Sequence, residues 1–322
     1  MSQKIKYGII GTGHLGKFHI QQMQKIKLVE VVGCYDVDLD LCYQVCKASG
    51  LQAFKSLKKL LQACDAISIA TPASSHFDVA KMGLEQQCHL FIEKPITSNL
   101  KQAKALIKQA KLHNKIIQVG HIERFNPAFL LYTKKQNPNP VYIESNRLSP
   151  FSERGLDVNV VLDLMIHDID LVLSLVRCKV KHIHEKGIKV LSNQTDLASA
   201  RIEFENGAVA NLVASRISEK KLRKMRVFEQ NQYTSLDFNS LTLEQYKTTN
   251  YNKNKNFVFY NQSRAIQHHK QAATPNNALY EELVSFINSI QANTNQVKVS
   301  AEEATLALTI ALKIEKIINN QK

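Results

Sequence analysis

The feature that most constrains the fold is a glycine-rich turn near the N-terminus, between an apolar stretch and a helix-like stretch. Residues 7–10 predict a buried strand, and the turn Gly11-Thr12-Gly13-His14-Leu15-Gly16 leads into an expected helix over Lys17–Lys25. In such a unit the first glycine permits the tight turn, the second lets a pyrophosphate approach the backbone, and the third allows close helix–strand packing. The pattern predicts a dinucleotide-binding unit in which residues 11–16 hold the cofactor.

A second apolar stretch, residues 31–35, ends in an acid, Asp36. At this place in a dinucleotide-binding unit an acid accepts hydrogen bonds from the adenosine ribose, and its charge would repel the 2′-phosphate of NADP. No arginine directly follows Asp36 to accommodate such a phosphate. We therefore predict NAD as the cofactor in preference to NADP. The alternative is that Asp36 only caps the next helix.

Strand-like and helix-like segments continue to alternate as far as residue 120. This alternation predicts an α/β fold with a parallel, doubly wound sheet, and we place a first, dinucleotide-binding domain at residues 1–120. The expected helices cover residues 55–64, 77–86 and 100–113, and the expected strands cover residues 66–70, 89–93 and 115–120.

In the second half, residues 121–322, strand-like segments predominate over helix-like ones. We expect a mostly antiparallel, open sheet with helices on one face, and a hairpin turn at Asn206-Gly207. One helix near Val158–Val176 interrupts the strands, and the polar stretch Lys247–Lys255 is expected to be a loop. The C-terminal helix could pack back on the first domain. The expected strands are Val141–Leu148, Val180–Val190, Ala198–Phe204, Ala208–Ile217, Leu222–Gln230 and Tyr233–Phe238, and the closing helices are Asn277–Gln291 and Ala301–Ile318.

Two segments carry candidate catalytic side chains. The apolar strand His89–Ile92 runs into Glu93-Lys94-Pro95, which puts Lys94 at the carboxyl end of a parallel strand, where ligands bind in open α/β sheets. In the helix near residues 158–176, Asp163 and His167 stand at i and i+4 and share one face. Asp168 and Asp170 are expected to be solvated or to cap the helix.

Composition excludes several classes of protein. The longest apolar runs of these 322 residues fall short of the roughly 20 residues of a membrane span, and the first residues enter a strand without room for a signal peptide. The six cysteines predict buried thiols of a cytoplasmic protein, with no metal site and no disulfide. The net charge of +14 includes a basic cluster at residues 220–226, which we interpret as solvated strand positions that help to attract an anionic substrate, and not as a nucleic-acid site.

Taken together, these motifs resemble those of the Gfo/Idh/MocA oxidoreductase superfamily. The likeness rests on the glycine motif, Glu93-Lys94-Pro95 and Asp163-x-x-x-His167, and covers the whole chain. Thr71-Pro72 and His76 also match a family segment, although Ala73 replaces the asparagine that is common there. The resemblance implies a Rossmann domain followed by an open-faced α/β domain, and NAD(P)-dependent oxidation of sugars or cyclitols. It implies homodimers or homotetramers formed through the second sheet. The cofactor contacts that it implies come from Thr71, Pro72, His76, Glu93 and Lys94. It also implies that Lys94, Asp163 and His167 are catalytic.

A narrower resemblance, to the branch that includes UDP-N-acetylglucosamine 3-dehydrogenases, rests on residues 119–128, 215–218 and 223–228. It implies a nucleotide-sugar substrate, a 3-keto product that a pathway aminotransferase could consume without a stable complex, and substrate contacts from His121, Arg124, Asn126 and Arg154. The alternatives are a dehydrogenase of a free sugar or cyclitol, and an NAD-binding sensor or scaffold without turnover.

Oxidation of a secondary alcohol needs a base for the hydroxyl proton while hydride leaves carbon for the nicotinamide. We expect His167 to be this base and Lys94 to hydrogen-bond the reacting oxygen and stabilise its developing charge. Asp163 would orient the pair. A lysine can also serve as a base when it is buried, so the sequence leaves open whether His167 or Lys94 takes the proton.

Overall fold

The structure is a computed structural model that describes residues 4–135, 138–152, 158–250, 259–260, 264–294 and 296–320. Its contacts divide the chain into two compact units. The first comprises residues 1–125 and 277–308, and the second comprises residues 126–276 and 309–322. A single cut at residue 120 therefore does not describe the division, because residues 277–308 return to the first unit.

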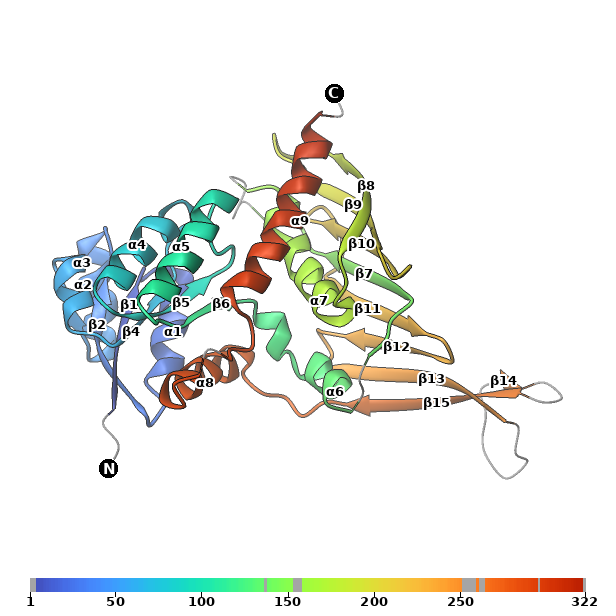
Figure 1. Ribbon diagram of the computed structural model, residues 1–322, viewed down its shortest axis with the longest axis horizontal. Coiled ribbons are helices and arrows are strands. Elements are labelled where there is room, and N and C mark those ends of the chain that lie inside the picture. Colours follow the sequence, from blue (N-terminus) through green and yellow to red (C-terminus); the bar gives the residue numbers. More distant parts are fainter. Residues whose placement is uncertain are drawn as a thin grey trace. The chain divides into compact units, whose positions relative to one another are not determined.

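The first unit is built on a six-stranded parallel sheet (Figure 1). The strand order β3-β2-β1-β4-β5-β6 is that of a doubly wound dinucleotide-binding domain, as expected from the alternating segments. The order reverses between β1 and β4, which places the turn after β1 at the crevice where ligands bind. The elements are β1 (Ile5–Ile10), α1 (His14–Met23), β2 (Val29–Tyr35), α2 (Leu39–Ser49), β3 (Gln52–Ala53), α3 (Leu57–Gln62), β4 (Ala66–Ile69), α4 (Ala73–Glu85), β5 (His89–Glu93), α5 (Leu100–Leu112), β6 (Ile117–Gly120) and η1 (Ile122–Phe125).

One helix from the end of the chain completes the core of this unit. The apolar face of α8 (Ala278–Gln291) places Leu283, Phe286 and Ile287 in one buried cluster with residues of β1, β2, α1 and α2. Phe286 lies edge-on to Tyr7 and Phe91, with ring centroids 6.4 and 5.9 Å apart. Helix α8 thus packs on the first sheet because its apolar face matches that of the sheet, and residues 301–308, the start of the C-terminal helix, also belong to the first unit.

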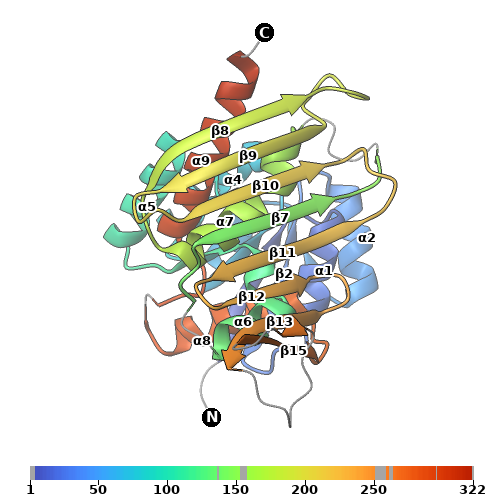
Figure 2. The same cartoon turned by 90° about the vertical axis from the view of Figure 1, so that its right-hand side faces the viewer.

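The second unit is built on a nine-stranded sheet with the order β14-β15-β13-β12-β11-β7-β10-β9-β8. Only β7 and β10 pair in parallel among its described pairings, and the others are antiparallel, as expected. Figure 2 looks onto the face of this sheet that no helix of the described residues covers, with α6 and α7 behind it. The strands are β7 (Tyr142–Leu148), β8 (Val180–Ile188), β9 (Leu197–Phe204), β10 (Val209–Ser215), β11 (Leu222–Glu229), β12 (Gln232–Asp237), β13 (Thr242–Asn250), β14 (Phe259–Tyr260) and β15 (Arg264–Ala272).

Three helical segments belong to this unit: α6 (Pro127–Lys135), the π-helical turn η2 (Val161–Met165) and α7 (Ile166–Val176). The long last helix, α9 (Ala301–Asn320), is shared, since the division between the units falls after Leu308. The helix expected near residues 158–176 therefore consists of two helical types joined at residue 166.

The expectation of a loop over Lys247–Lys255 is wrong for its first part. Residues 247–250 complete β13, which pairs with β15 from Thr242 to Asn250, and residues 251–255 lie outside the described residues. Polar side chains are tolerated here because one face of the sheet carries no described helix. No helix in the described ranges is long and apolar enough to span a membrane.

Candidate cofactor and catalytic residues

The glycine-rich turn has the geometry that a dinucleotide requires. Gly11 adopts a left-handed conformation with φ of 91°, and a Cβ there would lie 2.7 Å from the Ala70 backbone. A Cβ on Gly16 would collide with the carbonyl oxygen of Gly11, so only glycine lets α1 approach β1 this closely. At Gly13, by contrast, a Cβ would have no described atom within 4 Å, which leaves the backbone open to a phosphate. These residues fit an NAD pyrophosphate at the N-terminus of α1.

Asp36 lies at the end of β2 and is held by the glycine-rich turn. Its Oδ2 accepts hydrogen bonds from the backbone N–H of Thr12 at 2.6 Å and from the Thr12 hydroxyl at 3.0 Å. The alternative that Asp36 caps the next helix is wrong, because the N-cap of α2 is Asp38, whose side chain accepts from the N–H of Leu41 at 2.9 Å. Asp36 is therefore left for another role, which fits the predicted contact with ribose.

The segment after β4 is tied to the Glu-Lys-Pro turn through His76. One ring nitrogen of His76 lies 2.9 Å from the carbonyl oxygen of Thr71, and the other lies 2.8 Å from that of Pro95. Thr71 also receives a hydrogen bond from Ser75 at 2.8 Å, and Pro72 is the N-cap of α4. Because His76 is fully buried, its imidazole holds two loops of the crevice in place.

Glu93 ends β5, and its carboxylate is anchored to α1. His19 Nε2 lies 2.9 Å from Glu93 Oε1. Burial would raise the pKa of Glu93, but the hydrogen bond from His19 and the electrostatic interactions with His19, Lys94 and His76 outweigh burial and hold this pKa below its ordinary value. A Cβ on Gly120 would lie 3.0 Å from the Glu93 carboxylate, so the glycine at the end of β6 makes room for it. The chain therefore keeps an anion beside Lys94.

The anchor of Glu93 extends into the core, and sequence reasoning missed it. His19 Nδ1 lies 3.0 Å from the hydroxyl of Ser68, which in turn lies 2.8 Å from the hydroxyl of Tyr7. All three side chains are fully buried. The only sequence signal for His19 is its place one turn after Gly16 on the inward face of α1. Ser68 and Tyr7 look like ordinary strand residues, so their partnership becomes visible only when β1 and β4 pair.

Asp163 and His167 lie in the second unit, at η2 and in the first turn of α7. Both are half-buried, whereas most neighbours in this stretch are buried. Asn159 holds the start of the segment, since its side-chain oxygen accepts from the N–H groups of Val161 and Leu162 at 2.9 and 3.0 Å. Isolated π turns inside helices occur often at functional sites.

Asp168 and Asp170 are buried, and the N-cap of α7 is Met165, so the expectation that they are solvated or cap the helix is wrong. Arg147, on β7, donates to both carboxylate oxygens of Asp168, with Nε–Oδ2 at 2.9 Å and Nη2–Oδ1 at 3.0 Å. The two side chains are each 3% exposed. A charged pair can be buried when its hydrogen bonds are satisfied in this way, and the pair fastens the first turn of α7 to the sheet next to His167.

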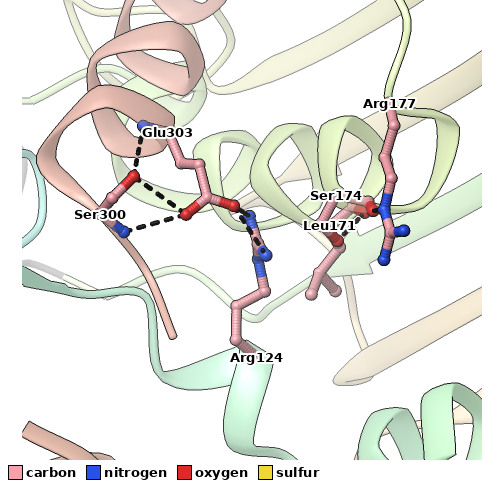
Figure 3. Close-up of polar contacts among 6 residues, drawn as sticks. All are labelled: Arg124, Leu171, Ser174, Arg177, Ser300 and Glu303. Atoms are coloured by element: carbon pink, nitrogen blue, oxygen red, sulfur yellow. Dashed lines mark hydrogen bonds and ion pairs between the residues drawn. The ribbon is translucent and has the colours of Figure 1, made fainter. Parts of the chain in front are cut away.

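The predicted substrate residues have different surroundings. His121 and Arg124 are buried in the first unit, and both Nη atoms of Arg124 lie 3.5 Å from Glu303 Oε1 (Figure 3). The other oxygen of Glu303 accepts from the N–H and the hydroxyl of Ser300 at the start of α9. Asn126, in the second unit, donates to the Phe238 carbonyl at 3.3 Å.

Arg154 lies outside the described residues. Within the second unit, Figure 3 also shows the end of α7, where the Ser174 hydroxyl donates to Leu171 and Arg177 Nε donates to the Ser174 carbonyl. These contacts close the last turn of α7, and Arg177 itself takes the left-handed conformation that ends the helix.

Comparisons with known proteins agree with this architecture. Residues 5–121 match the family model described as "Oxidoreductase family, NAD-binding Rossmann fold", and residues 130–231 match the "GFO/IDH/MocA C-terminal domain". The chain is 38% identical over 242 residues to the UDP-N-acetylglucosamine 3-dehydrogenase of Acidithiobacillus ferrooxidans, which covers 75% of this chain and 77% of that protein. It is 26% identical to the scyllo-inositol 2-dehydrogenase (NAD(+)) of Bacillus subtilis, over 68% of this chain and 69% of that one.

Among solved structures, the UDP-N-acetylglucosamine 3-dehydrogenase GnnA from Acidithiobacillus ferrooxidans superimposes with a TM-score of 0.89. The sequence identity is 33%, and the superposition covers 98% of each chain. Fold, glycine-rich turn and family models thus agree on an oxidoreductase that acts on CH–OH groups with NAD as its cofactor. The chain belongs to the Gfo/Idh/MocA family of NAD-binding oxidoreductases.

Proposed function

We propose that this enzyme uses NAD to oxidise the 3-hydroxyl of a UDP-linked N-acetylglucosamine to a 3-keto group. What carries the proposal is likeness along nearly the whole chain to a dehydrogenase named for that substrate, at a TM-score of 0.89 and 33% identity. The net charge of +14 suits a substrate that carries a diphosphate. His121, Arg124, Asn126 and Arg154 are the proposed substrate contacts.

Each catalytic residue has a proposed role that its chemistry supports. Bound NAD supplies the hydride acceptor. Lys94 donates a hydrogen bond to the reacting oxygen and stabilises negative charge as it develops there. His167 accepts the hydroxyl proton, because imidazole titrates near neutral pH, and Asp163 orients His167 and offsets the charge of Lys94. The carboxylate of Glu93, held by His19, precedes Lys94 in the chain and adds to this balance of charge.

In this proposal, all of the residues that bind NAD belong to the first unit. The backbone of residues 11–16 binds the pyrophosphate, and Asp36 accepts hydrogen bonds from the adenosine ribose. Thr71, Pro72 and His76 shape the crevice beside them, since His76 joins the Thr71 and Pro95 carbonyls.

The test is NADH formation by the purified protein with UDP-N-acetylglucosamine, UDP-glucose, free N-acetylglucosamine, myo-inositol and scyllo-inositol. We expect kcat/KM for UDP-N-acetylglucosamine to exceed that for the free sugar by about 100-fold or more, because a diphosphate adds several charge-assisted hydrogen bonds. Preference for an inositol would favour the second candidate, a cyclitol dehydrogenase, which the 26% identity to scyllo-inositol 2-dehydrogenase supports. Binding of NAD without turnover of any of the five compounds would favour a sensor or scaffold.

The uncovered face of the second sheet is the proposed subunit interface of a homodimer or homotetramer. A row of neighbouring rings crosses it, one pair edge-to-face at 5.7 Å and the others stacked at 4.5 to 5.2 Å between centroids, and two ion pairs lie among the same strands. The rings are Tyr142, Phe228, Tyr233, Tyr246 and His268. Light scattering should give the mass of an oligomer, and Tyr233→Arg should lower it, whereas a monomeric wild type would contradict the proposal.

The proposed surroundings of the enzyme follow from its chemistry. NAD and nucleotide sugars are cytoplasmic compounds, and the six cysteines are free thiols, so we propose a cytoplasmic enzyme. A 3-keto sugar is a substrate for amine transfer, so an aminotransferase is the proposed next enzyme, without a stable complex. Cell fractionation and a coupled assay with such an aminotransferase test these two points.

A further inference from the structure

We propose that Thr12 is a positioning residue that sets the preference of this enzyme for NAD over NADP, by fixing the carboxylate of Asp36 through its hydroxyl group. The inference rests on the proposed contact between Asp36 and the adenosine ribose. It assigns a role to the side chain between Gly11 and Gly13, beyond the roles of the glycines themselves.

Thr12 makes two hydrogen bonds to one oxygen of Asp36. Its backbone N–H lies 2.6 Å from Asp36 Oδ2, and its hydroxyl lies 3.0 Å from the same atom. The other oxygen, Oδ1, accepts the N–H of Asp38 at 3.1 Å. Thr12 is fully buried, whereas Asp36 is half-buried, so the hydroxyl acts on the carboxylate and presents no surface of its own to a ligand.

These bonds determine which oxygen is left for the cofactor. A carboxylate can accept about four hydrogen bonds, two on each oxygen. Thr12 fills both positions on Oδ2, and Asp38 fills one on Oδ1, so the remaining capacity lies on Oδ1. With both Thr12 donors on Oδ2 the carboxylate plane cannot rotate without losing hydrogen bonds. A ribose hydroxyl therefore meets an acceptor that is already in place, which lowers the entropic cost of binding.

The same arrangement offers nothing to a 2′-phosphate. The single hydroxyl hydrogen of Thr12 is already donated to Asp36, so it is not available to a phosphate oxygen. The N-terminus of α2, where an anion could otherwise bind, is capped by the side chain of Asp38 and has Asp40 in its first turn. Val37, which is 87% exposed, provides no cation. A phosphate beside Asp36 would therefore face a carboxylate, with two further acids, Asp38 and Asp40, at the start of α2.

Removing only the hydroxyl of Thr12 separates this role from the turn itself. Thr12→Val keeps the side-chain shape and the backbone N–H, so the glycine-rich turn retains its fold, but one of the two donors to Oδ2 is lost. The carboxylate can then turn, and Oδ1 is no longer held for the ribose. Thr12→Ser restores the hydroxyl without the methyl group. The matched control is Thr97→Val, since Thr97 is a fully buried threonine of the same unit whose hydroxyl donates to Asn99 at 2.8 Å.

The experiment is calorimetric titration of the full-length wild type and these variants with NAD and with NADP, and circular dichroism checks that each is folded. For Thr12→Val we expect NAD affinity to fall by about tenfold while NADP affinity stays the same or rises, because a hydrogen bond to a carboxylate is lost from the NAD-selective arrangement. Thr12→Ser and Thr97→Val should both keep the wild-type ratio of the two affinities.

An unchanged ratio in Thr12→Val would overturn the proposal, as would an increase in NAD affinity, which would mean that the hydroxyl competes with the ribose. Failure of Thr12→Ser to restore the ratio would also overturn it, because the methyl group would then be responsible. Asp36→Ala tests the ribose contact of Asp36 separately from the role of Thr12. If Asp36→Ala keeps the ratio, the ribose contact of Asp36 is wrong. If Asp36→Ala changes the ratio while Thr12→Val keeps it, the ribose contact stands and Thr12 has no part in the selection.

Discussion

Replacing Arg147 with methionine should destabilise the second unit strongly, because it leaves the Asp168 carboxylate buried without its partner. The two side chains are each 3% exposed and are joined by two hydrogen bonds of 2.9 and 3.0 Å. Methionine fills much of the volume of the arginine stem but cannot donate a hydrogen bond. Arg147→Met therefore removes the positive charge and the hydrogen bonds to Asp168, with little change in packing.

The expected magnitude follows from the burial of the pair. Breaking a buried ion pair from one side typically costs about 3–5 kcal/mol, against about 0–1 kcal/mol for an exposed pair. At 3% exposure this pair belongs to the first class, so Arg147→Met should lower the free energy of unfolding by about 3–5 kcal/mol. The double variant Arg147→Met/Asp168→Leu removes both charges and should lie within about 2 kcal/mol of the wild type.

Urea unfolding followed by circular dichroism measures these differences, and it suits a chain that contains no tryptophan. The exposed pair Arg201–Glu203 supplies the matched control, since Arg201→Met should leave the urea midpoint almost unchanged. A loss below about 1 kcal/mol for Arg147→Met would refute the reasoning. So would a double variant as unstable as the single one, because the damage would then come from packing and not from an unpaired charge.

Three further predictions concern the reaction, its pH dependence and the pH dependence of stability. Lys94→Ala should lower kcat by about 100- to 1,000-fold with UDP-N-acetylglucosamine while NAD still binds in calorimetry, whereas the exposed Lys101→Ala should retain full activity. If His167 is the base, the rate of oxidation should rise with pH through the range in which histidine titrates. His167→Asn should remove both this rise and most of the turnover. If the variant keeps the rise and substantial activity, Lys94 is the base instead. Burial would raise the pKa of Asp196, but hydrogen bonds from residues 190–192 lower this pKa from 3.8 to about 2. The carboxylate therefore stabilises the fold fully at pH values above 3.8, and this stabilisation is lost as the pH falls toward 2. The difference in urea midpoint between wild type and Asp196→Asn should therefore be large at pH 7 and shrink below pH 3.8.

The features that sequence alone predicted are those whose cause is local. Gly16 is required because a Cβ there would collide with the carbonyl oxygen of Gly11, five residues earlier, and Gly11 is favoured by its own left-handed φ, although its contact with the Ala70 backbone is not local. The alternation of strands and helices likewise predicted the doubly wound sheet, since parallel strands need a crossover helix. The sheet of the second half was predicted less completely, and β13 and β15 were missed because most of their side chains are polar, so they lack the apolar alternation of a half-buried strand.

The polar anchors behind the site could not be predicted, because each joins residues that are distant in sequence. His19, Ser68 and Glu93 come from α1, β4 and β5, and their hydrogen bonds exist only once the sheet has formed. A histidine and a serine on inward faces look like core residues from their positions alone. Nothing in the spacing of the chain indicates that they share one chain of hydrogen bonds with a carboxylate.

Asp168 shows most clearly why the assignment of acids to solvent failed. Charged residues are almost never fully buried unless they are paired, so an acid on a helix next to His167 is reasonably expected to face water. The exception depends on Arg147, which lies 21 positions earlier on a strand and could equally have been a surface residue. Pairing turns both residues inward and fastens α7 to β7, and this attachment also fixes the turn that carries His167. An acid that sequence reasoning set aside as solvated is therefore the one through which the sheet holds the proposed base in position.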